Sequence, residues 1–202
     1  ENVSVERIVM EIEKAFKDDN PAAFLTAMDH FGLIEDVLGA EIEEEGFMFS
    51  SARLSDPQHR MIGFVLGIEK GSELDFDELQ SRLRLSNGLV FDARAVSDAL
   101  EFLMEHNMPE SGHMHRRFWH EFGHVMEAAQ AVARQNLGAP AAVFEEPDVE
   151  TDPVVTGADF IERGHEEGPV IGELVDAAHS HQLRHAETDR QTLIQEAEMQ
   201  IS

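Results

Sequence analysis

Three residues of this sequence have the types and spacing of a zinc site. His120, Glu121 and His124 form a His-Glu-x-x-His motif in the run H-E-F-G-H. In zinc peptidases, two His residues one helical turn apart bind Zn²⁺ through neutral imidazole, and the Glu serves as general base for the metal-bound water. The motif therefore offers one candidate active site, that of a zinc-dependent metallopeptidase.

The surroundings of this motif do not complete a peptidase site. Glu127 and Gln130 stand where the longer zinc-peptidase pattern carries a Gly and a third His. A third ligand further along is available only in the acidic stretch 144–153, which is expected to be mobile. A helix here places His120 and His124 opposite the apolar stripe. We therefore favour an exposed, His-rich face without a catalytic metal, and zinc peptidase chemistry stays the alternative.

The segments that carry and surround these residues are predicted to be helices. Apolar residues recur at helical spacing along most of the chain, and residues typical of helix starts stand between the runs. Asn20, Asp56, Asp75 and Ser86 are each followed by such a run, and Glu78 completes a capping box with Asp75. The pattern predicts an all-α fold, a multi-helix body with a small helical tail segment.

Some segments carry more specific expectations. Gly63 and Gly67 lie four residues apart in an apolar helix, which indicates close packing against another element. One continuous helix is predicted across 118–132. The segment 46–50 is predicted as a short strand or loop. The polar segment 189–201 is predicted to fray.

The most informative stretch predicts two short helices joined by a Gly-rich corner. Thr156 and Asp159 have the spacing of a capping box, and Gly164 is suited to the left-handed residue that ends a helix. Pro169 is suited to the first turn of the next helix. Gly172 lies inside that helix, where Gly costs about 1 kcal/mol relative to Ala. Because Gly172 lowers the stability of its helix, its presence predicts that another backbone approaches closely at this position.

This stretch resembles the C-terminal tail of bacterial-type (class II) tRNA nucleotidyltransferases, the CCA-adding enzymes, and of the related poly(A) polymerases. The run T-G-x-D-F-I-x-x-G-x-x-x-G-P-x-I-G-E-L carries the resemblance. Near the N-terminus, S-x-E-R-I followed by N-P-x-x-F-L and F-G-L-I resembles the family's neck-to-body transition. The run L-Q-S-R-L-R-L-S-N-G-L at 79–89 is similar to a body segment. Together the three patches, in the family's order, extend over nearly the whole chain.

The resemblance implies a division of the chain. It places a neck helix at 1–19, a helical body of RNA-binding type at 20–143 and a helical tail at 154–202. Between body and tail, the run F-E-E-P-D-V-E-T-D-P at 144–153 combines two prolines with five acids and predicts a solvated linker.

The resemblance places the family's chemistry in a catalytic head. That head carries a Gly-Gly-x-x-Arg-Asp loop, an Asp-x-Asp pair that holds two metal ions and a Glu-Asp-x-x-Arg element. The loop and the Glu-Asp-x-x-Arg element do not occur here, and the Asp-x-Asp run at 75–77 stands without either of them. We therefore expect the C-terminal part of a larger enzyme, or a split subunit. The complete enzyme would add C, C and A, or A alone, to an RNA 3′ end from CTP and ATP with Mg²⁺. This chain alone would bind no cofactor and would be inactive.

The resemblance and the charges also suggest site residues. Glu6 and Arg7 match the neck motif, which implies that they brace the nucleotide-reading element from behind. Expected partners are the catalytic head and tRNA or another RNA 3′ end, and no DNA. The candidate RNA contacts are two arginine pairs, Arg82 with Arg84 and Arg116 with Arg117.

The composition of the chain limits how strongly it can be expected to bind RNA. The formal net charge is -26, and only three of the 15 basic residues are Lys. RNA binding needs cationic side chains opposite the phosphates, so on this acidic chain we expect RNA contacts that are local and weak. The paired Arg residues could equally form ion pairs within the chain, and we favour that interpretation. A noncatalytic all-α interaction module is therefore a third reading. With no cysteine and no apolar run of 18 residues, the sequence predicts a cytoplasmic protein without a membrane helix.

Overall fold

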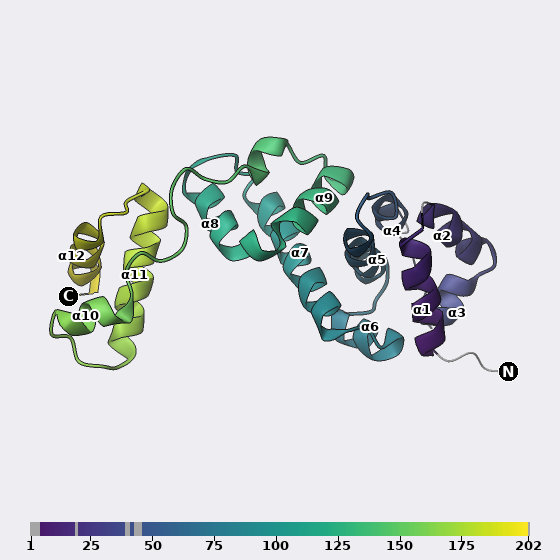
Figure 1. Ribbon diagram of the computed structural model, residues 1–202, viewed down its shortest axis with the longest axis horizontal. Coiled ribbons are helices and arrows are strands. Elements are labelled where there is room, and N and C mark those ends of the chain that lie inside the picture. The colour runs from purple at the N-terminus through teal and green to yellow at the C-terminus, as the bar shows by residue number, and fades with distance from the viewer. Residues whose placement is uncertain (1–4, 19, 39–40, 43–45, 202) are drawn as a thin grey trace. The chain divides into compact units, whose positions relative to one another are not determined.

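The computed structural model describes residues 5–18, 20–38, 41–42 and 46–201, and Ser4 of the neck pattern lies outside them. These residues are helical and contain no strand, which confirms the predicted all-α fold (Figure 1). None of their helices is long and apolar enough to cross a membrane. They form two compact units, 1–102 with 125–140 and 103–124 with 141–202. The boundaries of neck, body, linker and tail stay predictions.

The first unit is a bundle around one buried helix. Helix α5 is apolar on every side from Met61 to Ile68, which is the pattern of a helix buried in a core. It contacts α1, α4, α6 and α9. The helices of this unit are α1 (Val5–Phe16), α2 (Pro21–His30), α3 (Leu33–Leu38), α4 (Gly46–Ser51), α5 (Pro57–Gly71), α6 (Phe76–Leu83), most of α7 (Asn87–Glu105) and α9 (Met126–Asn136).

The two glycines of α5 allow α4 to pack against it. A Cβ at Gly67 would lie 2.5 Å from the Cα of Met48, and a Cβ at Gly63 would collide with the side chain of Ser51. The predicted close approach is therefore confirmed. The prediction of a strand or loop at 46–50 is wrong, because this segment is helical. Met48 and Ser51 are fully buried, so packing on α5 and not local sequence pattern determines the helix.

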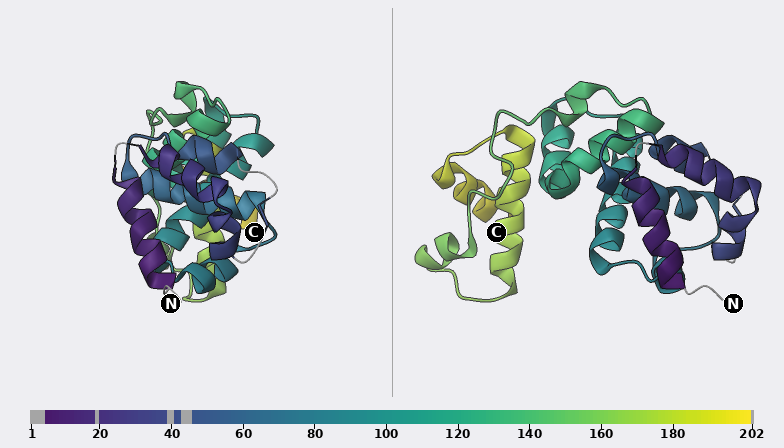
Figure 2. Two further views of the ribbon diagram at one scale, coloured as in Figure 1. Left: turned by 90° about the vertical axis from the view of Figure 1, so that its right-hand side faces the viewer. Right: turned by 45° about the vertical axis from the view of Figure 1, so that its right-hand side comes forward.

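The second unit contains the tail and the helix that carries the His-Glu-x-x-His motif. Its elements are α8 (Gly112–Phe122), the short 3₁₀ helix η2 (Ala141–Phe144), α10 (Gly157–Glu162), α11 (Pro169–His185) and α12 (Arg190–Ile201). Helix α11 contacts α8, α10 and α12. The group α10–α12 appears in green to yellow in Figures 1 and 2. Its core residues are Val155, Phe160, Leu174, Ala177, Ala178, Leu193, Ile194 and Ala197.

The prediction of one helix across 118–132 is wrong. Helix α8 ends at Phe122, a 3₁₀ turn η1 (Gly123–Val125) follows, and α9 then begins. Gly123 costs about 1 kcal/mol in a helix interior. The two helices also bury their apolar faces in different units, so packing favours a break between them.

The polar C-terminal segment is a packed helix, so the prediction that 189–201 frays is wrong. Leu193, Ile194 and Ala197 of α12 are buried against the tail core. The apolar stripe is only three residues wide, and the surrounding polar residues conceal it in the sequence. Arg190 fixes the start of α12, because its guanidinium donates to Asp159 at 2.8 Å and to the carbonyl of Val154 at 3.0 Å.

Two carboxylates make the second unit sensitive to acid. Thr156 donates its backbone N–H (2.7 Å) and its hydroxyl (2.9 Å) to Asp159, and these bonds lower the pKa of that carboxyl, as Arg190 also does. His165 and Arg163 lower the pKa of Glu198 in the same way. A carboxylate with a lowered folded-state pKa stabilises the fold above its unfolded pKa, and this stability is lost as pH falls through the folded value.

We therefore expect the melting temperature of this unit to fall steadily below a pH of about 4, the ordinary carboxyl value. Glu198→Gln should lower the melting temperature at neutral pH and flatten its decline in acid. Thermal unfolding by circular dichroism across this pH range tests the effect. An unchanged pH profile in the variant would contradict it.

The predicted close approach at Gly172 is wrong. A Cβ at Gly172 would meet no atom within 4 Å among the described residues, whereas a Cβ at Gly157 would lie 2.9 Å from Cγ2 of Ile171. We therefore expect Gly172→Ala to stabilise the chain by about 0.5 to 1 kcal/mol through higher helix propensity. Urea denaturation measures this change, and a loss of stability would contradict the account.

Candidate nucleic-acid interface

The predicted neck residues lie on the surface of α1. Glu6 and Arg7 are both exposed. The carboxylate of Glu6 forms an ion pair with the guanidinium of Arg84, the left-handed residue (φ 50°) that ends α6. The structure thus brings together one residue predicted to support the nucleotide site and one predicted to contact RNA. Their pairing joins α1 to the end of α6.

Two further arginines hold the N-terminal helices. Arg82 donates to the carbonyl of Leu38 at 2.7 Å, at the last residue of α3. Arg60 donates to the carbonyls of Phe16 at 2.8 Å and Asp18 at 2.9 Å, at the end of α1. Helix ends have unpaired carbonyls that cations satisfy well. Arginines from outside α1–α3 therefore fix the ends of α1 and α3.

The second arginine pair is also engaged within its own unit. Arg116 donates to the carbonyls of Leu183 at 2.6 Å and Arg184 at 3.1 Å, at the end of α11. Arg117 donates to Glu121 at 2.5 Å. The four candidate RNA arginines thus all have partners inside the chain: Arg84 and Arg117 form ion pairs, whereas Arg82 and Arg116 donate to backbone carbonyls. Arg84 and Arg117 keep more than half of their side-chain surface exposed, and RNA contact at these positions stays a prediction.

The contacts of the His-Glu-x-x-His motif do not support a metallopeptidase. The imidazole of His120 packs edge-on against that of His179, with 4.3 Å between ring centroids. Glu121 is paired with Arg117, and His124 lies beyond the end of α8. In the part of the chain that the structure describes, no group of three or more His, Asp or Glu residues could hold a metal ion.

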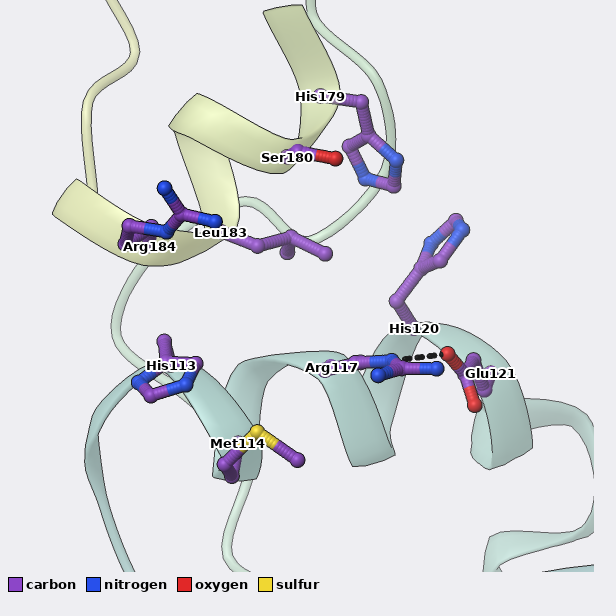
Figure 3. Close-up of a pocket in the computed structure, with 9 residues that line it drawn as sticks. All are labelled: His113, Met114, Arg117, His120, Glu121, His179, Ser180, Leu183 and Arg184. Carbon is purple, nitrogen blue, oxygen red and sulfur yellow. Dashed lines mark hydrogen bonds and ion pairs between the residues drawn. The ribbon is translucent and has the colours of Figure 1, made fainter. Parts of the chain in front are cut away.

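A polar pocket of about 510 Å³ lies between α8 and α11 (Figure 3). From the sequence, His179 is interpreted as structural, and no motif points to the other α11 residues, Ser180 and Arg184. Helical spacing could have shown that Ser180 and Arg184 share a face, but not that this face meets α8. The pocket is lined by His113, Met114, Arg117, His120, Glu121, His179, Ser180, Leu183 and Arg184.

The fold and these contacts define the chain as an all-α protein in which arginines fix the ends of the N-terminal helices. Comparison with protein families is more specific. Residues 1–43 match the family model described as "Probable RNA and SrmB- binding site of polymerase A". The match spans α1–α3 and supports a poly(A) polymerase-like RNA-binding region at this end of the chain. Comparisons with curated proteins and with solved structures gave no significant match.

Proposed function

We propose that this chain is the RNA-positioning region of a tRNA nucleotidyltransferase or poly(A) polymerase-like enzyme, which adds CCA or A to RNA 3′ ends. The match of residues 1–43 to an RNA-binding family model carries the proposal. Nucleotide transfer needs a metal-binding carboxylate pair, which belongs to the catalytic head. The proposal therefore gives this chain a binding role and leaves Mg²⁺ and the reacting groups to the head.

The ends of α1 and α3 suit such a positioning role. Arg60, Arg82 and Arg84 bind these helices through guanidinium contacts, so the region would meet RNA as a preorganised surface. The net charge of -26 opposes nonspecific binding of polyanions. RNA binding would then depend on a few local cations and would weaken steeply with salt.

Fluorescence anisotropy with a labelled tRNA transcript tests this function. We expect binding at about 50 mM salt that weakens by at least about tenfold at about 200 mM. A duplex DNA of equal length is the matched competitor and should bind more weakly. Equal binding of tRNA and DNA, or no binding of tRNA at the lower salt concentration, would remove the proposed function.

The Glu6–Arg84 pair separates RNA contact from internal support. Arg84→Gln removes both the ion pair and a cation, whereas Glu6→Gln removes the ion pair and leaves the guanidinium. If Arg84 contacts RNA, the first variant weakens tRNA binding and the second retains or strengthens it. Either change should cost at most about 1 kcal/mol of stability, because both side chains are largely exposed. Equal binding by the two variants would assign Arg84 to support alone.

A further inference from the structure

We propose that the pocket between α8 and α11 binds a phosphate group of the RNA backbone. This inference rests on the proposed function, because it assigns a second RNA contact outside the region of residues 1–43. The pocket lies entirely within the second unit.

The pocket contains hydrogen-bond donors without partners. The side chains of Arg184, Ser180 and His113 make no hydrogen bond or ion pair with any residue that the structure describes. Figure 3 places His113 on α8, facing the part of α11 that carries Leu183 and Arg184. A guanidinium presents N–H donors in a planar fork that matches two phosphate oxygens, and a hydroxyl or imidazole N–H can serve a third. The donor set therefore suits a phosphate group.

The local charge also favours an anion. Two guanidinium groups, Arg117 and Arg184, line the pocket against one carboxylate, Glu121. Outside the lining, the exposed carboxylate of Asp152 lies 3.5 Å from Nδ1 of His120. Arg116 adds a third guanidinium beside the pocket, bound to the last carbonyls of α11. This contact offsets the negative end of the helix dipole, which would otherwise repel an anion. The pocket is thus locally cationic on a chain whose net charge is -26.

A groove in the first unit has the opposite charge to the pocket between α8 and α11. Three carboxylates and one ammonium group line it, so its charge opposes phosphate. These charged residues are Glu13, Lys17, Asp56 and Asp92.

The lining favours a backbone phosphate over a free nucleotide. Base recognition uses aromatic or apolar walls on which the base stacks. Met114 and Leu183 are the apolar side chains of this lining, and its aromatic rings are imidazoles, with no Phe or Trp; two of these rings, His120 and His179, pack edge-on against each other. A volume of about 510 Å³ exceeds that of one phosphate and leaves room for the adjoining sugars. The geometry points to sequence-independent contact with a sugar-phosphate segment.

Arg184→Gln tests this inference, with Arg134→Gln as the matched control. Arg134 is an exposed arginine of α9 whose side chain makes no hydrogen bond or ion pair with the described residues, so both variants lose one charge. We expect Arg184→Gln to weaken binding of the tRNA transcript by about tenfold. The slope of log K against log salt should also fall by about 1, as for one lost phosphate contact. Arg134→Gln should bind like the unsubstituted chain.

The outcomes separate this inference from the proposed function. If the unsubstituted chain binds tRNA and both variants bind equally with equal slopes, the pocket proposal fails and the proposed function stands. If no chain binds tRNA, both fail. NMR titration with AMP and with inorganic phosphate distinguishes the source of the phosphate. Tight AMP binding that Arg184→Gln abolishes, without an effect on tRNA, would make the pocket a nucleotide site and overturn the inference.

Discussion

Gly67→Ala should destabilise the first unit by about 3 kcal/mol or more. The added Cβ would lie 2.5 Å from the Cα of Met48 and 2.7 Å from its backbone nitrogen. Neither atom can move unless α4 shifts away from α5, which would open the most tightly packed helix pair of this core. Overpacking of a well-filled core costs about 1 to 3 kcal/mol even where side chains can adjust, and here backbone atoms are in the way.

Urea denaturation followed by circular dichroism measures this effect. The matched control is Gly88→Ala in α7, because a Cβ at Gly88 meets no described atom within 4 Å. This control should change stability little or raise it by up to about 1 kcal/mol. If Gly67→Ala were as stable as Gly88→Ala, the packing of α4 on α5 would be wrong.

Gln182→Ala should destabilise the second unit by about 3 kcal/mol. Gln182 is 1% exposed and accepts a hydrogen bond from the backbone N–H of Val154 at 3.0 Å. It donates to the carbonyls of Glu150 at 2.9 Å and Asp152 at 2.8 Å. Alanine leaves these three part-buried backbone groups without this partner and opens a cavity at a buried position. A fully buried unpaired group costs about 1 to 3 kcal/mol, and the cost is lower for carbonyls that water reaches.

The loss should be concentrated in the acidic segment that leads into α10. Hydrogen exchange of residues 150–154 should accelerate more than that of α12. Gln195→Ala, an exposed position on α12, is the control and should leave both unchanged. Unaltered exchange at 150–154 in Gln182→Ala would show that this side chain does not anchor the segment.

The sequence predicted those structural features that depend on residues close together in the chain, such as helix caps and helix ends. Asp56 caps α5, Asp75 and Glu78 form the capping box of α6, and Gly164 has a φ of +99° after α10. Each of these features depends on residues only a few positions apart, so sequence is sufficient to find it. The same holds for the apolar α5.

Features that depend on distant contacts could not be predicted in this way. Helix α4 forms because Met48 packs against Gly67, and α12 forms because a narrow stripe reaches the tail core. The carboxylates of 144–153 are exposed, but the side chain of Gln182 binds the backbone of this segment, a contact that the sequence did not predict. The same holds for the candidate site: the sequence shows the arginines, but the partners of Arg82, Arg84 and Arg116 lie on other helices and could not be predicted.

The measurement that tests the central claim most directly is hydrogen exchange of the chain with and without saturating tRNA transcript at low salt. The account predicts slower exchange in α1–α3, the helices within the match at residues 1–43. Unchanged exchange throughout these helices while tRNA is bound would contradict the assignment of RNA binding to this region.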